Sequence, residues 1–273
     1  MNARLAGGLL LLGLLFVFAG TGALFVDLAD AQPLSAPVAQ APSAGYPFGT
    51  DSAGRDLLAV MVVGTLLTAK VGLLAGIIGI AFGTAIAFIA AYYGGWVDRL
   101  LSLVIDVLLT VPGLLVLIVI ASAWPGRMTT TLMALVIAAL AWRDPARQIR
   151  AQVLVMRQAN YVMMARLSGR SGMAIIFAEM MPNLLPYLGA GLVSAVSGAI
   201  LASVGLEALG LGPRHEPTLG MTIYWLIFEG AFLRGMWWWI LAPLVVLVML
   251  FVSMYLLLIG IDEFANPRLR RRA

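Results

Sequence analysis

Long apolar runs, separated by short polar segments, follow one another along the whole chain. A helix needs about 20 apolar residues to cross the hydrocarbon layer of a membrane, because its backbone amides must be satisfied within the segment. Runs of this length predict five spans, at residues 5–26, 71–93, 100–124, 184–206 and 237–261. Residues 129–142 are apolar but shorter, and count as a sixth span because the topology requires an even number of crossings. The pattern predicts an all-α, polytopic membrane protein with six transmembrane helices.

The composition agrees with this interpretation. Hydrophobic residues make up 62% of the chain and charged residues 11%, whereas a soluble domain carries roughly a quarter charged residues. The polar segments are too short to bury a core of their own, so we expect one integral domain. Within it we separate residues 1–70, a helix and an outer linker, from a core at 71–273 with a cytoplasmic loop at 143–183. The absence of cysteine excludes disulfides and thiolate metal sites.

The first apolar run has two interpretations. Arg4 precedes it and an Ala-Asp-Ala sequence follows at residues 29–31, as in a cleaved secretory signal. A signal core is about 7–15 residues long, however, and the run at residues 5–26 is uninterrupted. The length favours an uncleaved transmembrane helix.

The basic residues indicate the orientation. With the amino end inside, twelve of the 17 lysines and arginines fall on the cytoplasmic side, and the bias places both termini there. The net charge of +4 is explained by this topology, so no nucleic acid partner is expected. The twelve inner residues are Arg4, Arg99, Arg143, Arg147, Arg150, Arg157, Arg166, Arg170, Arg268, Arg270, Arg271 and Arg272.

Glycines form a stripe in the second predicted span. Gly72, Gly76, Gly79 and Gly83 recur at three- and four-residue spacing, which places them on one helix face. Small residues allow a second helix to approach closely. Packing within the same subunit is the favoured interpretation, and a dimer contact is the alternative.

The cytoplasmic loop at residues 143–183 carries six arginines. Apolar residues lie among them at helical spacing, which favours a helix that binds a partner over a solvated loop. These apolar residues are Tyr161, Val162, Met164, Ala165, Leu167, Ile175, Ile176 and Phe177.

Residues 161–169, with Ile175, Pro182, Asn183 and Pro186, resemble the cytoplasmic coupling motif of binding-protein-dependent ATP-binding-cassette importer permeases. The similarity is to the dipeptide, oligopeptide and nickel group, and to its second (C-type) permease subunit. Ala165, Arg166 and Gly169 match the motif, whereas Met163 and Met164 stand where the family usually has Glu and Ala. Four other segments resemble the group in the same order: residues 48–56, 93–99 with Asp106 and Pro112, 209–212 and 266–268.

The resemblance implies a fold, a role and a set of partners. It implies the six-helix fold of type I importer permeases in the inner membrane, and half of a pathway for peptides. The other half would come from a second permease, in a heterodimer. Two cassette subunits would hold ATP and Mg²⁺, and an outer binding protein would deliver the solute. The chain itself would be non-catalytic and hold no cofactor or metal. Contact with a cassette would fall to Met163, Met164, Ala165, Arg166, Gly169, Ile175, Phe177 and Pro182, in a short helix near residues 164–177.

The solute is open at this point. Residues 216–220 and 262–268, with Tyr224 and Trp225, also resemble members of the group that carry oligosaccharides. One histidine, His215, gives no support to a nickel importer. A secondary transporter would show repeated halves, and an enzyme would need a nucleophile with its base, so both are less expected than an importer permease.

Three residues are candidates for the pathway or for a structural role: Asp106, Pro112 and Glu207. Asp106 lies in the third predicted span, where a carboxylate is costly unless it faces protein or water. The resembling family has Asp there whatever its solute, which favours a structural role over solute binding.

Overall fold

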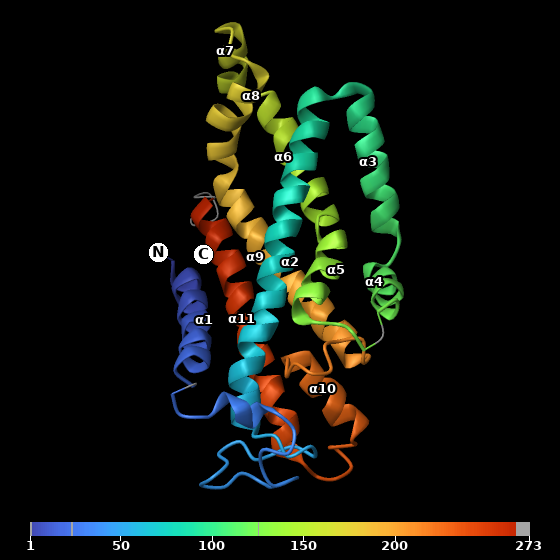
Figure 1. Ribbon diagram of the computed structural model, residues 1–273. Helices are drawn as coiled ribbons and strands as arrows, with labels where there is room; N and C mark the ends of the chain where they lie inside the picture. Colours follow the sequence, from blue (N-terminus) through green and yellow to red (C-terminus); the bar gives the residue numbers. More distant parts are fainter. Residues whose placement is uncertain (1, 23, 125, 266–273) are drawn as a thin grey trace.

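The computed structural model describes residues 2–22, 24–124 and 126–265, and their regular structure is helical (Figure 1). Within these ranges no strand is present beyond one isolated bridge between Thr50 and Asp56. The motif at residues 266–268 and the arginines at 268 and 270–272 lie outside the described residues. The elements are α1 (Ala3–Gly22), η1 (Leu28–Ala31), α2 (Leu57–Tyr93), α3 (Gly95–Thr110), α4 (Gly113–Ser122), α5 (Thr130–Ala141), α6 (Arg143–Arg157), α7 (Asn160–Leu167), α8 (Gly172–Ala174), η2 (Ile175–Met180), α9 (Met181–Ala208), α10 (Leu219–Phe228) and α11 (Trp237–Ala265).

The all-α membrane class is confirmed, but the count of six spans is not reproduced by helix length. Four helical segments of the described chain are long and apolar enough to cross a membrane: α1, α2, α8 to α9, and α11. The bent pair α3 and α4 gives a fifth. The remaining predicted span is α5, whose 12 residues lead directly into the arginine-rich α6. Charge therefore ends the apolar stretch before it reaches membrane length.

The second predicted span begins earlier than residue 71. Helix α2 starts at Leu57 because the Asp56 carboxylate accepts a hydrogen bond from the Leu58 amide at 2.9 Å and caps the helix. Its 37 residues extend about 55 Å, well beyond a hydrocarbon layer of about 30 Å. The boundary expected at residue 70 therefore lies within α2.

The third predicted span is wrong as one continuous helix. Helices α3 and α4 meet at an angle of 80°, with Val111 and Pro112 between them. Proline has no amide hydrogen to donate to the carbonyl of residue 108, and it disfavours helical backbone at the preceding residue. Val111 is extended accordingly, with ψ 127°.

Helix α2 is the central element, and α5, α6 and α9 pack along it (Figure 1). The glycine stripe forms these contacts: Gly72 and Gly76 face Ile200 and Val196 of α9. Farther along, Gly79 and Gly83 face the junction of α5 and α6. The preference for packing within the subunit is confirmed.

Helices α1 and α11 lie side by side at the edge of the bundle (Figure 1). The Asn2 side chain donates to the Gly260 carbonyl at 3.0 Å and to Glu263 at 2.8 Å. Arg4 also pairs with Glu263. The start of α1 and the end of α11 therefore lie together, on the side facing away from the linker at residues 27–56.

Candidate coupling surface and membrane cavity

Helix α7 stands at the end of the molecule farthest from the linker (Figure 1). It ends in a motif that needs glycine: the Gly169 amide donates to the Arg166 carbonyl, and the Arg170 amide donates to the Ala165 carbonyl. Gly169 has φ +74°, in the left-handed region that side chains disfavour. The glycine three residues after the motif arginine therefore closes the helix and reverses the chain.

Each face of α7 has a distinct role. Val162 and Ala165 are buried against Ile175 and Met180, in a cluster that includes Phe88 of α2. The opposite face is exposed, with Met163 54% and Met164 63% accessible. Helix α7 therefore packs against the bundle through one apolar face and leaves a second apolar face exposed.

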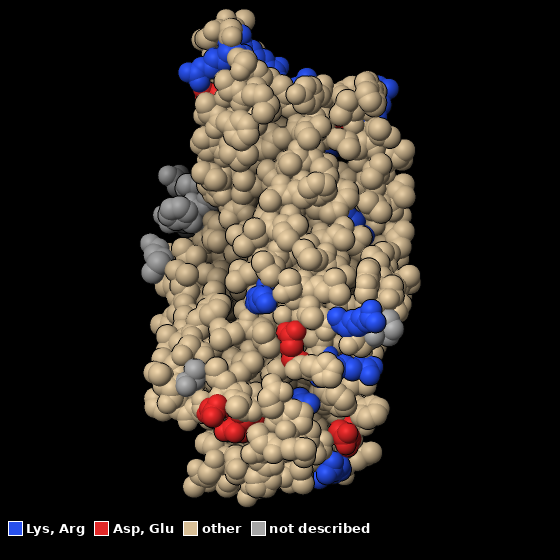
Figure 2. Space-filling view, in the orientation of Figure 1, with Lys and Arg blue, Asp and Glu red and all other residues tan. Residues whose placement is uncertain are grey.

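Three further residues extend the exposed apolar face. Leu167, Met173 and Phe177 are all exposed. We call the five residues Met163, Met164, Leu167, Met173 and Phe177 the coupling surface. In Figure 2, lysines and arginines gather around this end of the molecule, with fewer charges toward the middle. An apolar patch with a basic border is typical of a protein–protein contact.

Polar contacts fix the base of the coupling surface. The Arg166 guanidinium lies 5.8 Å from the ring centroid of Tyr92, within the range of a cation–π contact. Arg170 and Glu179 pair at 2.5 Å. These contacts tie α7 and the following turn to α2 and to the π-helical segment η2.

The predicted site residues divide into two groups. Met163, Met164 and Phe177 are exposed, and Gly169 shapes the turn beside them. Ala165 and Ile175 are buried, so they support the surface from within. Pro182 is exposed in the first turn of α9, next to the π-helical turn that ends there. The short helix itself is Asn160–Leu167, and thus begins and ends before the range expected from the sequence.

A cavity of about 660 Å³ lies between helices of the bundle. Helices α4, α5, α6 and α9 contribute most of its walls. One wall is a row of small residues on α9: Gly191, Ser194, Ala195, Gly198, Ala202 and Gly205. Because these side chains are short, α9 leaves open volume where larger residues would fill it.

The three pathway candidates do not form one site. The Asp106 side chain is 61% exposed and lies 3.8 Å from Arg147 of α6. Pro112 marks the break between α3 and α4. Glu207 is fully buried near the end of α9, and its carboxylate accepts hydrogen bonds from the Ser203 hydroxyl at 2.7 Å and the Thr218 hydroxyl at 2.5 Å. None of the three is among the described residues that line the cavity.

Arg143 is the cavity residue that the sequence interpretation missed, because it was counted only as an orienting charge. Its Nη1 donates to the Leu108 carbonyl at 2.6 Å, and its Nε donates to the Leu140 carbonyl at 2.9 Å. The Leu108 carbonyl is the one that Pro112 leaves without a backbone donor. Arg143 therefore supplies a hydrogen-bond donor to the carbonyl left free by the break between α3 and α4. In the sequence, a proline just before an apolar run is the feature that indicates such a free carbonyl.

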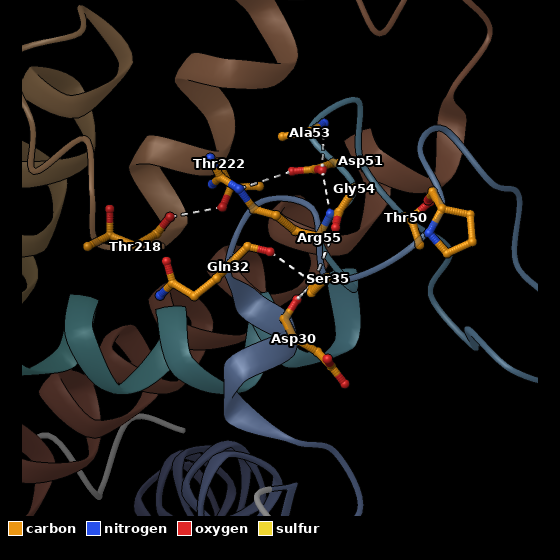
Figure 3. A network of polar contacts seen from close by, with 11 residues as sticks. Asp30, Gln32, Ser35, Thr50, Asp51, Ala53, Gly54, Arg55, Thr218 and Thr222 are labelled. Carbon is orange, nitrogen blue, oxygen red and sulfur yellow. Dashed lines mark hydrogen bonds and ion pairs between the residues drawn. The ribbon is translucent and has the colours of Figure 1, made fainter.

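At the opposite end of the molecule, buried polar residues join the linker to α10. Arg55 lies 3.7 Å from Asp51 and extends toward Thr222 (Figure 3). Its guanidinium carbon is 5.9 Å from the Trp225 ring centroid. Burial raises the pKa of the Asp51 carboxyl and lowers the pKa of the Arg55 guanidinium. The Arg55 and Asp51 pair therefore lies between the linker and α10, although Arg55 Nε and the Trp225 indole nitrogen are buried without a hydrogen-bond partner among the described residues. Neither here nor in the rest of the described chain is a group of three or more His, Asp or Glu side chains placed to hold a metal ion.

Comparison with known proteins decides the family. Residues 79–271 match the family described as the binding-protein-dependent transport system inner membrane component. The chain belongs to this family. The match includes α7, the residues that line the cavity and the last part of α2, so the coupling surface and the cavity both lie within the family's common region.

Individual relatives carry peptide names. The chain is 28% identical to the dipeptide transport system permease protein DppC of Haemophilus influenzae, over 83% of this chain and 75% of the relative. It is 29% identical to the oligopeptide transport system permease protein OppC of Mycobacterium tuberculosis, over 85% of this chain and 79% of the relative. It is also 29% identical to the glutathione transport system permease protein GsiD of Pectobacterium atrosepticum, over 63% of this chain and 57% of the relative.

Proposed function

We propose that this permease forms half of the translocation pathway of an ATP-driven peptide importer and couples a cassette to that pathway. The observation that carries the proposal is the coupling surface, five exposed apolar residues on α7 and on the α8 and η2 segments that follow it. The other face of α7 is buried. An exposed apolar patch without a partner is costly, and a rigid base is needed if a partner's displacement is to move the bundle.

The partners follow from this role. A second permease would complete the pathway as a heterodimer, and two cassette subunits would bind ATP and Mg²⁺. The permease would hold no catalytic residue and no cofactor. An outer binding protein would approach the end formed by the linker and α10. This arrangement requires both termini in the cytoplasm, and the proposal is supported by the start of α1 and the end of α11, which lie together on the side away from the linker (Figure 1).

Peptides are the proposed solute class. The names of three relatives, for dipeptides, oligopeptides and glutathione, support it. The sequence likeness to oligosaccharide carriers makes an oligosaccharide the alternative that the experiment must separate.

The test is to co-express the chain with its neighbouring importer subunits, purify the complex, and measure ATPase activity. The binding protein would be loaded in turn with a short peptide and with an oligosaccharide. We expect stimulation by the peptide-loaded form. Stimulation by the oligosaccharide alone would replace the solute class, and failure of any cassette to co-purify would remove the importer role.

Single substitutions test the coupling surface itself. Met164→Glu and Leu167→Glu place a charge on the exposed face and should abolish cassette co-purification. Met164→Leu keeps the apolar character and is the matched control, with binding retained. If the glutamate variants fold and still bind the cassette, the coupling surface lies elsewhere.

A further inference from the structure

Arg143 is a buried cation in the wall of the cavity between α4, α5, α6 and α9. The residue is 8% exposed, and it lines the cavity together with Gly113. Among the described residues, no carboxylate oxygen lies within 4.0 Å of its guanidinium nitrogens. Its two hydrogen bonds go to neutral backbone carbonyls, so its charge has no counterion within 4.0 Å in the part of the chain that the structure describes.

A buried charge without a counterion is costly, so a negatively charged group that reaches the guanidinium would interact favourably with it. A guanidinium has five N–H donors, and the two bonds described occupy Nε and Nη1. Nη2 lies beside Gly113, where an added Cβ would be 2.6 Å away. Glycine at this position therefore makes room for the guanidinium, whose Nη2 makes no hydrogen bond among the described residues.

The guanidinium is also held in place before any solute arrives. The Leu108 and Leu140 carbonyls fix it from two helices, α3 and α5. A fixed donor loses little conformational freedom when it binds an acceptor. Planar guanidinium groups bind carboxylates through short, charge-assisted hydrogen bonds.

The rest of the wall narrows the class of ligand. Most lining residues are apolar or small, and Gln148, Tyr187 and Ser194 add uncharged polar groups. Asp144 is the acidic residue of the lining, next to Arg143 in sequence. One charge of each sign suits a zwitterion better than a neutral sugar or a polyanion.

We propose that Arg143 contacts a carboxylate of the transported solute while the solute occupies this cavity. The proposal rests on the peptide importer function above and deepens it, since a free peptide carries a carboxylate at its C-terminus. On this proposal the permease, and not only the binding protein, distinguishes solutes that carry a carboxylate from solutes that do not.

The experiment uses the complete importer in proteoliposomes, with two solutes that differ at one group. One is a short peptide with a free C-terminal carboxylate, and the other is the same peptide as its C-terminal amide. Uptake of both is measured for the wild type, Arg143→Gln and Arg143→Lys. Because the same loaded binding protein serves every variant, its own preference cancels from the comparison.

We expect Arg143→Gln to reduce uptake of the acid about tenfold more than uptake of the amide, as the loss of a charged hydrogen bond implies. Arg143→Lys should recover part of the difference. Equal reductions for both solutes would show that Arg143 only supports the bend between α3 and α4, and would overturn the proposal.

Pro112→Ala is the matched control for the structural role. An alanine amide can donate to the Leu108 carbonyl, so the variant alters the bend without removing the guanidinium. The loss of acid uptake relative to amide uptake should be smaller in Pro112→Ala than in Arg143→Gln, because the guanidinium is retained. An equal selective loss in both variants would count against Arg143 as the contact. A wild type that imports neither peptide form would instead remove the peptide function, and this inference with it.

Discussion

The two ends of the molecule are built in opposite ways. At the linker end, polar side chains are buried and paired with one another, as in Glu207 with Ser203 and Thr218. At the α7 end, apolar side chains are exposed and the polar contacts lie beneath them. Burying polar groups is costly unless they are satisfied, and exposing apolar groups is costly unless they are covered. The linker end therefore holds a buried polar network, although Phe232 and Leu233 are exposed there as well. The α7 end differs in that its exposed apolar residues lie above the polar contacts that support them.

The largest expected effect tests the buried polar network at the linker end. Glu207→Leu removes the acceptor for two buried hydroxyls, one of which also caps α10 through the Met221 amide. We expect the free energy of unfolding to fall by roughly 3 kcal/mol or more. Thermal unfolding of the purified permease measures it.

Glu216→Ala is the control for this substitution. Glu216 is only partly buried and accepts one hydrogen bond, from the Thr130 amide at 3.3 Å. Its loss should cost less than about 1 kcal/mol. Equal losses for the two variants would mean that the Glu207 contacts do not hold the linker end together.

The next effect concerns the contact between α3 and α6. Arg150 binds Asp98 through two bonds, Nε to Oδ1 at 2.6 Å and Nη2 to Oδ2 at 2.8 Å. Arg150→Met should destabilise the protein by about 1–2 kcal/mol, since the pair is partly exposed, and Arg150→Lys by about half of that. A double-mutant cycle with Asp98→Asn isolates the pair, and a coupling energy of zero would contradict the structural role.

A smaller effect tests the turn beneath the coupling surface. Gly169→Ala should cost about 1 kcal/mol, because the left-handed backbone penalises a side chain. No described atom lies near the position of an added Cβ, so the cost is conformational alone. We expect substrate-stimulated ATPase activity to fall about fivefold. Gly169→Asn should lose less, and the reverse order would exclude the proposed cause.

The smallest effect is the pH dependence of the cap on α2. Burial raises the pKa of the Asp56 carboxyl above its unfolded value of 3.8. The folded state then holds the proton more tightly, so this contribution to stability declines as pH rises from 3.8 to the folded pKa.

Asp56→Asn keeps a capping oxygen and should remove this pH dependence, whereas Asp56→Ala should remove the pH dependence and also cost about 1 kcal/mol through loss of the cap. Hydrogen exchange of the first turn of α2 between pH 4 and 7 measures both. Asp27→Ala, at the exposed cap of η1, is the control and should leave α2 unchanged. An unchanged slope in Asp56→Asn would show that another group titrates.

The sequence alone predicted the membrane class, five of the helical runs and the place of the coupling motif. These features are local: apolar length sets a span, and the order of small, basic and apolar residues sets the motif. The residue pattern at 161–169 also predicted a helix with an exposed apolar face, and the partner that would cover this face stays a prediction. Met173 was missed, because it lies beyond Gly169, where the chain turns and helical spacing from α7 no longer applies.

Only the tertiary structure decided how distant segments satisfy one another. Hydropathy made residues 100–124 one span, although Pro112 bends it by 80° and Arg143, 35 residues from Leu108, supplies the missing donor. Likewise, the buried Glu207 carboxylate is satisfied by the Thr218 hydroxyl, which lies at the start of the next helix. Apolar length is a property of one segment and is visible in the sequence. The pairing of a buried charge or a freed carbonyl depends on which helices pack together, and only the folded bundle fixes that.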